Sequence, residues 1–124
     1  MFELDRLHAA LGAGDGATLR ELVTEDVEWN VPGGGSLAGV YRGLGGVLEY
    51  IARRRELSDG TFRSAPLELL WGDEHMAVIT LGTVTKDGLE RAWSEVALYR
   101  LRDGRVSECR LLPLDQAAFD AIWS

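Results

Sequence analysis

Residues 72–114 read GDEHMAVITLGTVTKDGLERAWSEVALYRLRDGRVSECRLLPL and contain three turn signals, Gly72-Asp73, Asp87-Gly88 and Asp103-Gly104. An Asp-Gly pair between alternating apolar residues favours a β-hairpin, because both turn residues then take a positive φ that suits the strand twist. The signals therefore predict four antiparallel strands in a meander, over residues 61–71, 75–85, 89–102 and 105–114. Strands of this length twist strongly, so one face of the sheet becomes concave.

Helices and one further strand are expected before this meander. Apolar residues at helical spacing predict helices over residues 2–13, 17–23 and 44–55, and strict alternation predicts a strand over residues 26–31. Asp15 is placed to cap the second helix, and Asp115 is placed to cap a short closing helix. Helices that are segregated from an antiparallel sheet define an α+β fold.

Composition limits the classes of protein to consider. A chain of 124 residues is large enough for one domain, residues 1–124, with its own core. The net charge of -7 argues against a nucleic-acid partner, which would require clustered Lys and Arg. The run Arg53-Arg54-Arg55 lies at the end of a predicted helix, where we expect it to face water and complement the helix dipole.

Three other features of the sequence predict the cellular location of the protein. The first residues are acidic where a secretory signal would be basic, and no segment has the roughly 20 apolar residues that span a bilayer. Cys109 is the only cysteine, so an internal disulfide is excluded. We therefore expect a cytoplasmic protein with no membrane partner. With two histidines on different elements, we also expect no metal and no cofactor.

Four segments resemble one superfamily, and together they span nearly the whole chain. They are LHAALGAGDGATLRELVTEDVEWNVPG (7–33), SLAGVYRGLGGVLEYI (36–51), YRLRDGRVSE (99–108) and LDQAAFDAIW (114–123). The chain resembles the nuclear transport factor 2-like superfamily, which includes ketosteroid isomerases, SnoaL-like polyketide cyclases and limonene epoxide hydrolases. The resemblance implies a cone-shaped, cystatin-like roll in which three helices from the N-terminal half cover the concave face of a strongly curved sheet. It also implies an apolar pocket and a homodimer through the outer face of the sheet.

The chemistries of these relatives can be compared with the residues at matching positions. The catalytic positions of ketosteroid isomerases fall on Leu7, on Trp29 or Asn30, and on Ala97, none of which can serve as acid or base, so that activity is rejected. In SnoaL-like cyclases the acidic residue after the last strand is the base, and Asp115 matches that position. An aspartate at the start of a helix is more often only a cap, although one residue could serve both purposes.

Limonene epoxide hydrolases use two carboxylates with an arginine between them. Here Glu95, Asp115 and Arg110 could form such a set only if all three side chains faced inward. Alternation along the last strand places Cys109 and Leu111 on one face and Arg110 on the other. If the register of the superfamily holds, as the resemblance implies, the first face points to the pocket and Arg110 points outward, which disfavours this activity.

Glu95 shares one face of its strand with Trp93, Ala97 and Tyr99. If that face points inward, a raised pKa suits the carboxyl for acid–base work; if it points outward, Glu95 is an ordinary surface charge. The candidate catalytic residues are therefore Asp115 and Glu95. The candidate substrate-binding residues are Trp29, Asn30, His8, Trp93, Tyr99, Cys109 and Leu111.

Two functions remain open from the sequence. The protein is either a SnoaL-like enzyme performing cofactor-free isomerisation, cyclisation or hydration on a small hydrophobic molecule, or a non-catalytic binding or dimerisation module of the same fold. The few ionisable groups expected to face inward favour the binding module, whereas the resemblance to biosynthetic enzymes favours catalysis.

Overall fold

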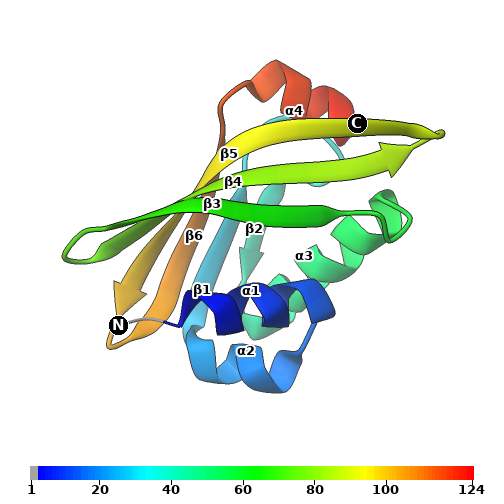
Figure 1. Ribbon diagram of the computed structural model, residues 1–124. Helices are drawn as coiled ribbons and strands as arrows, with labels where there is room; N and C mark the ends of the chain where they lie inside the picture. The colour runs from blue at the N-terminus through cyan, green and yellow to red at the C-terminus, as the bar shows by residue number, and fades with distance from the viewer. Residues whose placement is uncertain (1–2) are drawn as a thin grey trace.

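The computed structural model describes residues 3–124 and consists of a curved six-stranded sheet with four helices (Figure 1). In chain order the elements are α1 (Leu4–Ala13), α2 (Gly16–Leu22), β1 (Val23–Val31), β2 (Gly39–Arg42), α3 (Gly43–Leu57), β3 (Arg63–Trp71), β4 (His75–Lys86), β5 (Leu89–Arg102), β6 (Arg105–Pro113) and α4 (Gln116–Ile122). The strands lie in the order β2-β1-β6-β5-β4-β3. Neighbouring strands are antiparallel except β1 and β6, which are parallel. The predicted α+β class and mainly antiparallel sheet are confirmed.

The meander of β3 to β6 forms where the turn signals predict it. Asp87 and Gly88 between β4 and β5 have φ values of 53° and 76°, and Asp103 and Gly104 between β5 and β6 have 53° and 77°. These two tight turns require the left-handed backbone that Asp and Gly tolerate. The Gly72-Asp73 turn differs, because neither residue has a positive φ. Its three-residue loop is closed instead by a 2.8 Å hydrogen bond from the Gly72 amide to the His75 carbonyl.

The short strand β2 is absent from the sequence prediction. Its four residues follow a glycine-rich loop and are too few to show a period of two. Tyr41 in β2 pairs with Trp29 in β1, which on its other side pairs with Cys109 in β6. β1 thus joins the first half of the chain to its last strand, and it begins three residues earlier than predicted.

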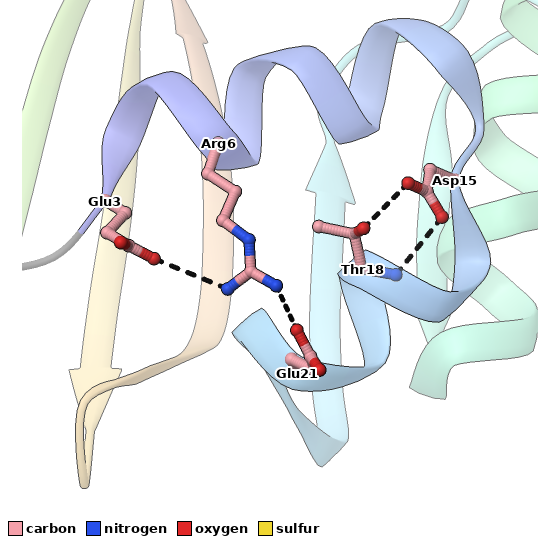
Figure 2. Close-up of polar contacts among 5 residues, drawn as sticks. All are labelled: Glu3, Arg6, Asp15, Thr18 and Glu21. Atoms are coloured by element: carbon pink, nitrogen blue, oxygen red, sulfur yellow. Dashed lines mark hydrogen bonds and ion pairs between the residues drawn. The ribbon is translucent and has the colours of Figure 1, made fainter.

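The N-terminal helices begin and end at the expected signals. Gly14, with φ of 67°, ends α1, and Asp15 caps α2 by accepting a hydrogen bond from the Thr18 amide. Figure 2 shows this cap beside an ion-pair group in which Arg6 of α1 contacts both Glu3 and Glu21. The predicted start of the first helix at Phe2 lies outside the described residues.

The core fills the space between the concave face of the sheet and the helices. α1, α2 and α3 gather on one side of the sheet, whereas α4 packs against β5 and β6 at the other end (Figure 1). Buried residues alternate with less buried ones along β4, β5 and β6, which marks the inner face of each strand. Within residues 3–124, no helix combines the length and apolar character that crossing a membrane requires.

Candidate functional site

A cavity of about 380 Å³ lies between the helices and the concave face of the sheet. Its walls come from six parts of the chain: α1, β1, the second half of α3 with the loop after it, the start of β3, β5 and β6. Among the predicted site residues, the structure places His8, Trp29, Glu95, Tyr99 and Leu111 in this lining. Residues far apart in the sequence therefore meet around one space.

Glu95 is the one carboxylic acid in the cavity lining, and it is buried, with 7% of its surface exposed. It lies on the inner face of β5, opposite Thr80 of β4 and Pro113 of β6. The indole Nε1 of Trp93 donates a 2.6 Å hydrogen bond to its Oε1. Burial raises the pKa of Glu95, while the Trp93 hydrogen bond and the Arg54 charge partly oppose that rise.

The raised pKa of Glu95 makes stability depend on pH in a defined direction. The folded state holds the Glu95 proton more tightly than the unfolded chain, in which a Glu titrates near pH 4.5. The stabilisation from this group is complete below that pH and is lost as the pH rises through the folded pKa. We therefore expect the free energy of unfolding of E95Q, relative to that of the wild type, to increase as the pH rises above 4.5.

Urea denaturation of both proteins from pH 4.5 to about pH 8 measures this difference. Asp15 and Asp26 have lowered pKa values and give the opposite slope at lower pH, but they are common to both proteins and cancel. E90Q, at an exposed position of the same strand, should follow the wild-type profile. Parallel profiles for E95Q and the wild type would contradict a raised pKa.

Arg54 is buried in the cavity wall, with 7% of its surface exposed, and this corrects the expectation that the whole basic run faces water. Its guanidinium donates to the Leu11 carbonyl at 3.0 Å and to the Tyr50 hydroxyl at 3.5 Å. The guanidinium carbon lies 4.2 Å from the centroid of the Phe62 ring. The signal was present in the sequence, because Val47, Tyr50, Ile51 and Arg54 share one helical stripe at i, i+3, i+4 and i+7.

Three aromatic rings form one part of the cavity wall. The ring of Trp29 lies edge-on to the ring of Tyr99, and their centroids are 5.8 Å apart. The centroid of the Trp29 ring also lies 6.1 Å from that of Tyr50. The three residues come from β1, β5 and α3, so the wall depends on the tertiary fold. Tyr50 is a further lining residue that the sequence analysis did not single out, although it lies on the same helical stripe as Arg54.

Trp93 and Cys109 are buried but lie outside this lining. Trp93 packs edge-on against Phe119 and Trp123, and it contacts two residues of the lining, Phe62 through its ring and Glu95 through its hydrogen bond. Burial raises the pKa of the Cys109 thiol well above its usual value, which disfavours the thiolate that a nucleophile needs.

Two predicted site residues lie away from the cavity. Asn30 lies on the face of β1 opposite to Trp29, because successive strand residues alternate, and it donates a 3.3 Å hydrogen bond to the Cys109 carbonyl. Asp115 is exposed and caps α4 by accepting a 3.0 Å hydrogen bond from the Ala118 amide. We therefore leave both out of the proposed site.

The carboxylate pair and arginine of the epoxide-hydrolase arrangement do not come together. Arg110 is exposed on the outer face, where it contacts Glu108 at 3.3 Å, and Asp115 is exposed at the start of α4. Glu95 alone of the three residues lines the cavity. The outward direction predicted for Arg110 is thus the one observed.

A curved sheet with helices along its concave face and a cavity between them defines a nuclear transport factor 2-like roll. This is the class that the sequence resemblance implied. The chain belongs to the SnoaL-like domain family, whose model matches residues 4–109. Membership of this family fits a protein that binds small molecules.

Similar proteins cover nearly the whole chain. The uncharacterized protein Rv0034 of Mycobacterium tuberculosis is 28% identical over 120 residues, which are 96% of this chain and 92% of the mycobacterial one. The structure of Bal32a, from a soil-derived mobile gene cassette, superimposes with a TM-score of 0.89 at 28% identity, covering 98% of this chain and 93% of Bal32a. A protein of unknown function with a cystatin-like fold from Xanthomonas campestris superimposes with a TM-score of 0.84 at 29% identity. The match covers 100% of this chain and 99% of the Xanthomonas chain.

Proposed function

We propose that the protein binds a small hydrophobic molecule in the cavity and performs cofactor-free acid–base chemistry on it, with Glu95 as the acid or base. In this proposal residues 1–124 act as one SnoaL-like domain. The observation that carries it is the burial of Glu95 against a cavity of about 380 Å³, with a pKa raised by that burial. A raised pKa makes the carboxylate form of Glu95 a stronger base, which suits a group that takes and returns a proton.

The chemistry follows from one carboxyl group and an aromatic wall. Glu95 as carboxylate would remove a proton from a carbon next to a carbonyl group, which leaves an enolate. Return of the proton to a different carbon completes an isomerisation. Attack of the enolate carbon on a second carbonyl group of the same molecule forms the ring bond, and the alkoxide that results takes the proton back from Glu95, which completes a cyclisation. Trp29, Tyr50 and Tyr99 offer flat apolar surfaces that hold a ring-containing substrate beside the carboxyl.

Deuterium exchange into β-tetralone tests the proposal without knowledge of the natural substrate. This two-ring ketone is small enough for the cavity and has acidic protons next to its carbonyl group. We expect the wild-type protein in D₂O to accelerate loss of these proton signals, followed by NMR, over buffer and over free acetate at equal carboxylate concentration. A rate equal to the acetate control would argue against catalysis at Glu95.

A non-catalytic binding module is the second candidate. It is favoured by the presence of a single carboxyl in the lining, because many acid–base sites use two ionisable groups of different pKa. Ligand retained by the purified protein, detected by native mass spectrometry, together with no exchange activity, would support this alternative.

We also propose that two copies associate through the outer face of the sheet. By register, Ile79, Val96 and Leu112 form one row across this face, and Leu112 is 44% exposed. Apolar residues exposed in a contiguous group indicate a contact surface, and a twofold dimer covers the same surface on both copies.

Sedimentation velocity tests the dimer. The wild type should sediment as a dimer, and L112E should sediment as a monomer with an unchanged circular dichroism spectrum, because a buried unpaired carboxylate opposes association. L89E, which alters an exposed leucine at the β4–β5 turn, should remain dimeric. A wild type that stays monomeric at high concentration would contradict the proposal.

A further inference from the structure

The charges around the cavity differ in sign from those of the whole chain. Apart from two tyrosines, the ionisable residues in the lining are His8, Arg54, Arg55, Arg63 and Glu95, so three guanidinium groups accompany one carboxyl. The complete chain carries a net charge of -7. A cleft with walls of low dielectric concentrates such a local field and attracts ligands of the opposite sign.

None of these three arginines is used in an ion pair within residues 3–124. Five other arginines, at positions 6, 42, 100, 102 and 110, each lie within 4.0 Å of a carboxylate. Arg55 and Arg63 instead donate to backbone carbonyls of Gly12, Gly60 and Phe62. Both are exposed residues of the lining, which places their positive charges at the opening of the cavity.

Arg54 lies deeper and is held in place by neutral groups. Its two hydrogen bonds, to the Leu11 carbonyl and the Tyr50 hydroxyl, use two of the five N–H groups of a guanidinium. The rings of Phe62 and Tyr50 lie 4.2 Å and 5.2 Å from the guanidinium carbon. No ion pair of Arg54 is found within residues 3–124, although Glu95 of the same lining is near enough for the Arg54 charge to lower its pKa. A buried guanidinium without a direct ion pair binds an anion strongly, because water competes little there.

We propose that the cavity selects ligands that carry an anionic group on an apolar, ring-containing body, and that Arg54 binds the anionic group. Arg55 and Arg63 at the opening attract the anion, and Trp29 and Tyr99 contact the apolar body. The proposal rests on the proposed function only in that the same cavity holds the ligand. It does not require Glu95 to catalyse a reaction.

Two fluorescent probes of nearly equal shape separate charge from apolar binding. 8-Anilinonaphthalene-1-sulfonate (ANS) is an anion, whereas N-phenyl-1-naphthylamine (NPN) has the same rings and no charge. Because charge-assisted hydrogen bonds to a buried site are strong, we expect the wild type to bind ANS about tenfold more tightly than NPN, or better. The preference should shrink with added salt as the charges are screened.

Substitutions of individual arginines identify the residue that causes the preference for ANS over NPN. R54Q should reduce ANS binding about tenfold and leave NPN binding within about twofold of the wild type. R54K should keep part of the preference, because lysine retains the charge but not the planar fork. R53Q, an exposed neighbour outside the lining, is the matched control and should bind both probes as the wild type does. If R54Q does not fold, R63Q tests whether the positive charge at the opening attracts the anion. R63Q should lower the affinity for ANS a few-fold.

The outcomes distinguish this proposal from catalysis by Glu95. E95Q removes the only negative charge from the lining, so it should bind ANS at least as tightly as the wild type even where exchange activity is lost. Equal affinity for the two probes in the wild type would overturn anion selection and leave the cavity as a neutral site. A preference for ANS that survives undiminished in R54Q would overturn the assignment of Arg54 as the residue that binds the anionic group. Failure of both probes to bind would overturn anion selection and ligand binding together.

Discussion

Replacing Glu95 by glutamine should slow deuterium exchange into β-tetralone by about 100-fold or more, since general acid–base groups typically contribute that much. Glutamine has nearly the same shape and can still accept the hydrogen bond from Trp93, so the cavity wall should be preserved. An amide cannot take a proton from carbon near neutral pH, and no other carboxyl in the lining can replace it.

Two matched variants control for charge and for the other candidate acid. E90Q removes one negative charge from an exposed position of β5, and its exchange rate should equal that of the wild type. D115N keeps a side chain that caps α4 well, so the fold should be retained and the exchange rate should not change. Loss of exchange in D115N with retention in E95Q would reverse the assignment of the catalytic residue.

Replacing Trp93 by alanine should lower the free energy of unfolding by about 3–5 kcal/mol and the melting temperature by about 10 °C or more. The indole packs against Phe62, Phe119 and Trp123. A Cβ on Gly82 would lie 2.4 Å from the Trp93 ring, so the ring rests directly on the backbone of β4. Alanine would leave a large cavity there and remove the hydrogen bond to the Glu95 carboxyl.

W71A is the matched control, since Trp71 is 42% exposed on the edge strand β3. It should cost about 1 kcal/mol or less, because an exposed side chain leaves no cavity behind. Thermal and urea unfolding of the two variants give the comparison. Similar losses for W93A and W71A would mean that the cluster around Trp93 does not hold the sheet and α4 together.

The sheet could be predicted because its signals are local. Asp87-Gly88 and Asp103-Gly104 fix two hairpin turns, and the alternating pattern around them decides which residues of β4, β5 and β6 share a face. The strand β2 could not be predicted, because its pairing with β1 depends on tertiary contacts of four residues. The parallel pairing of β1 with β6 has no local signal either, since the partners are far apart in the chain.

The candidate site was predictable in part for the same reason. The face of β5 that carries Glu95 and Tyr99 follows from alternation, but its direction depends on which side the helices cover. Arg54 was misassigned because a run of three arginines suggests a solvated helix end. Only the middle residue continues the buried stripe of α3, and a buried cation is decided by the rings packed around it.

Because β1 pairs with β6, the sheet can form in full only after β6 has been synthesised. Trp29 and Cys109 are partners across an interval that includes most of the chain, so contacts of high sequence separation close the sheet late in folding. A nascent chain that has not yet emerged past residue 105 leaves one long edge of β1 exposed, with only β2 beside it. We expect a chain without β6 to be prone to aggregate through that unpaired edge.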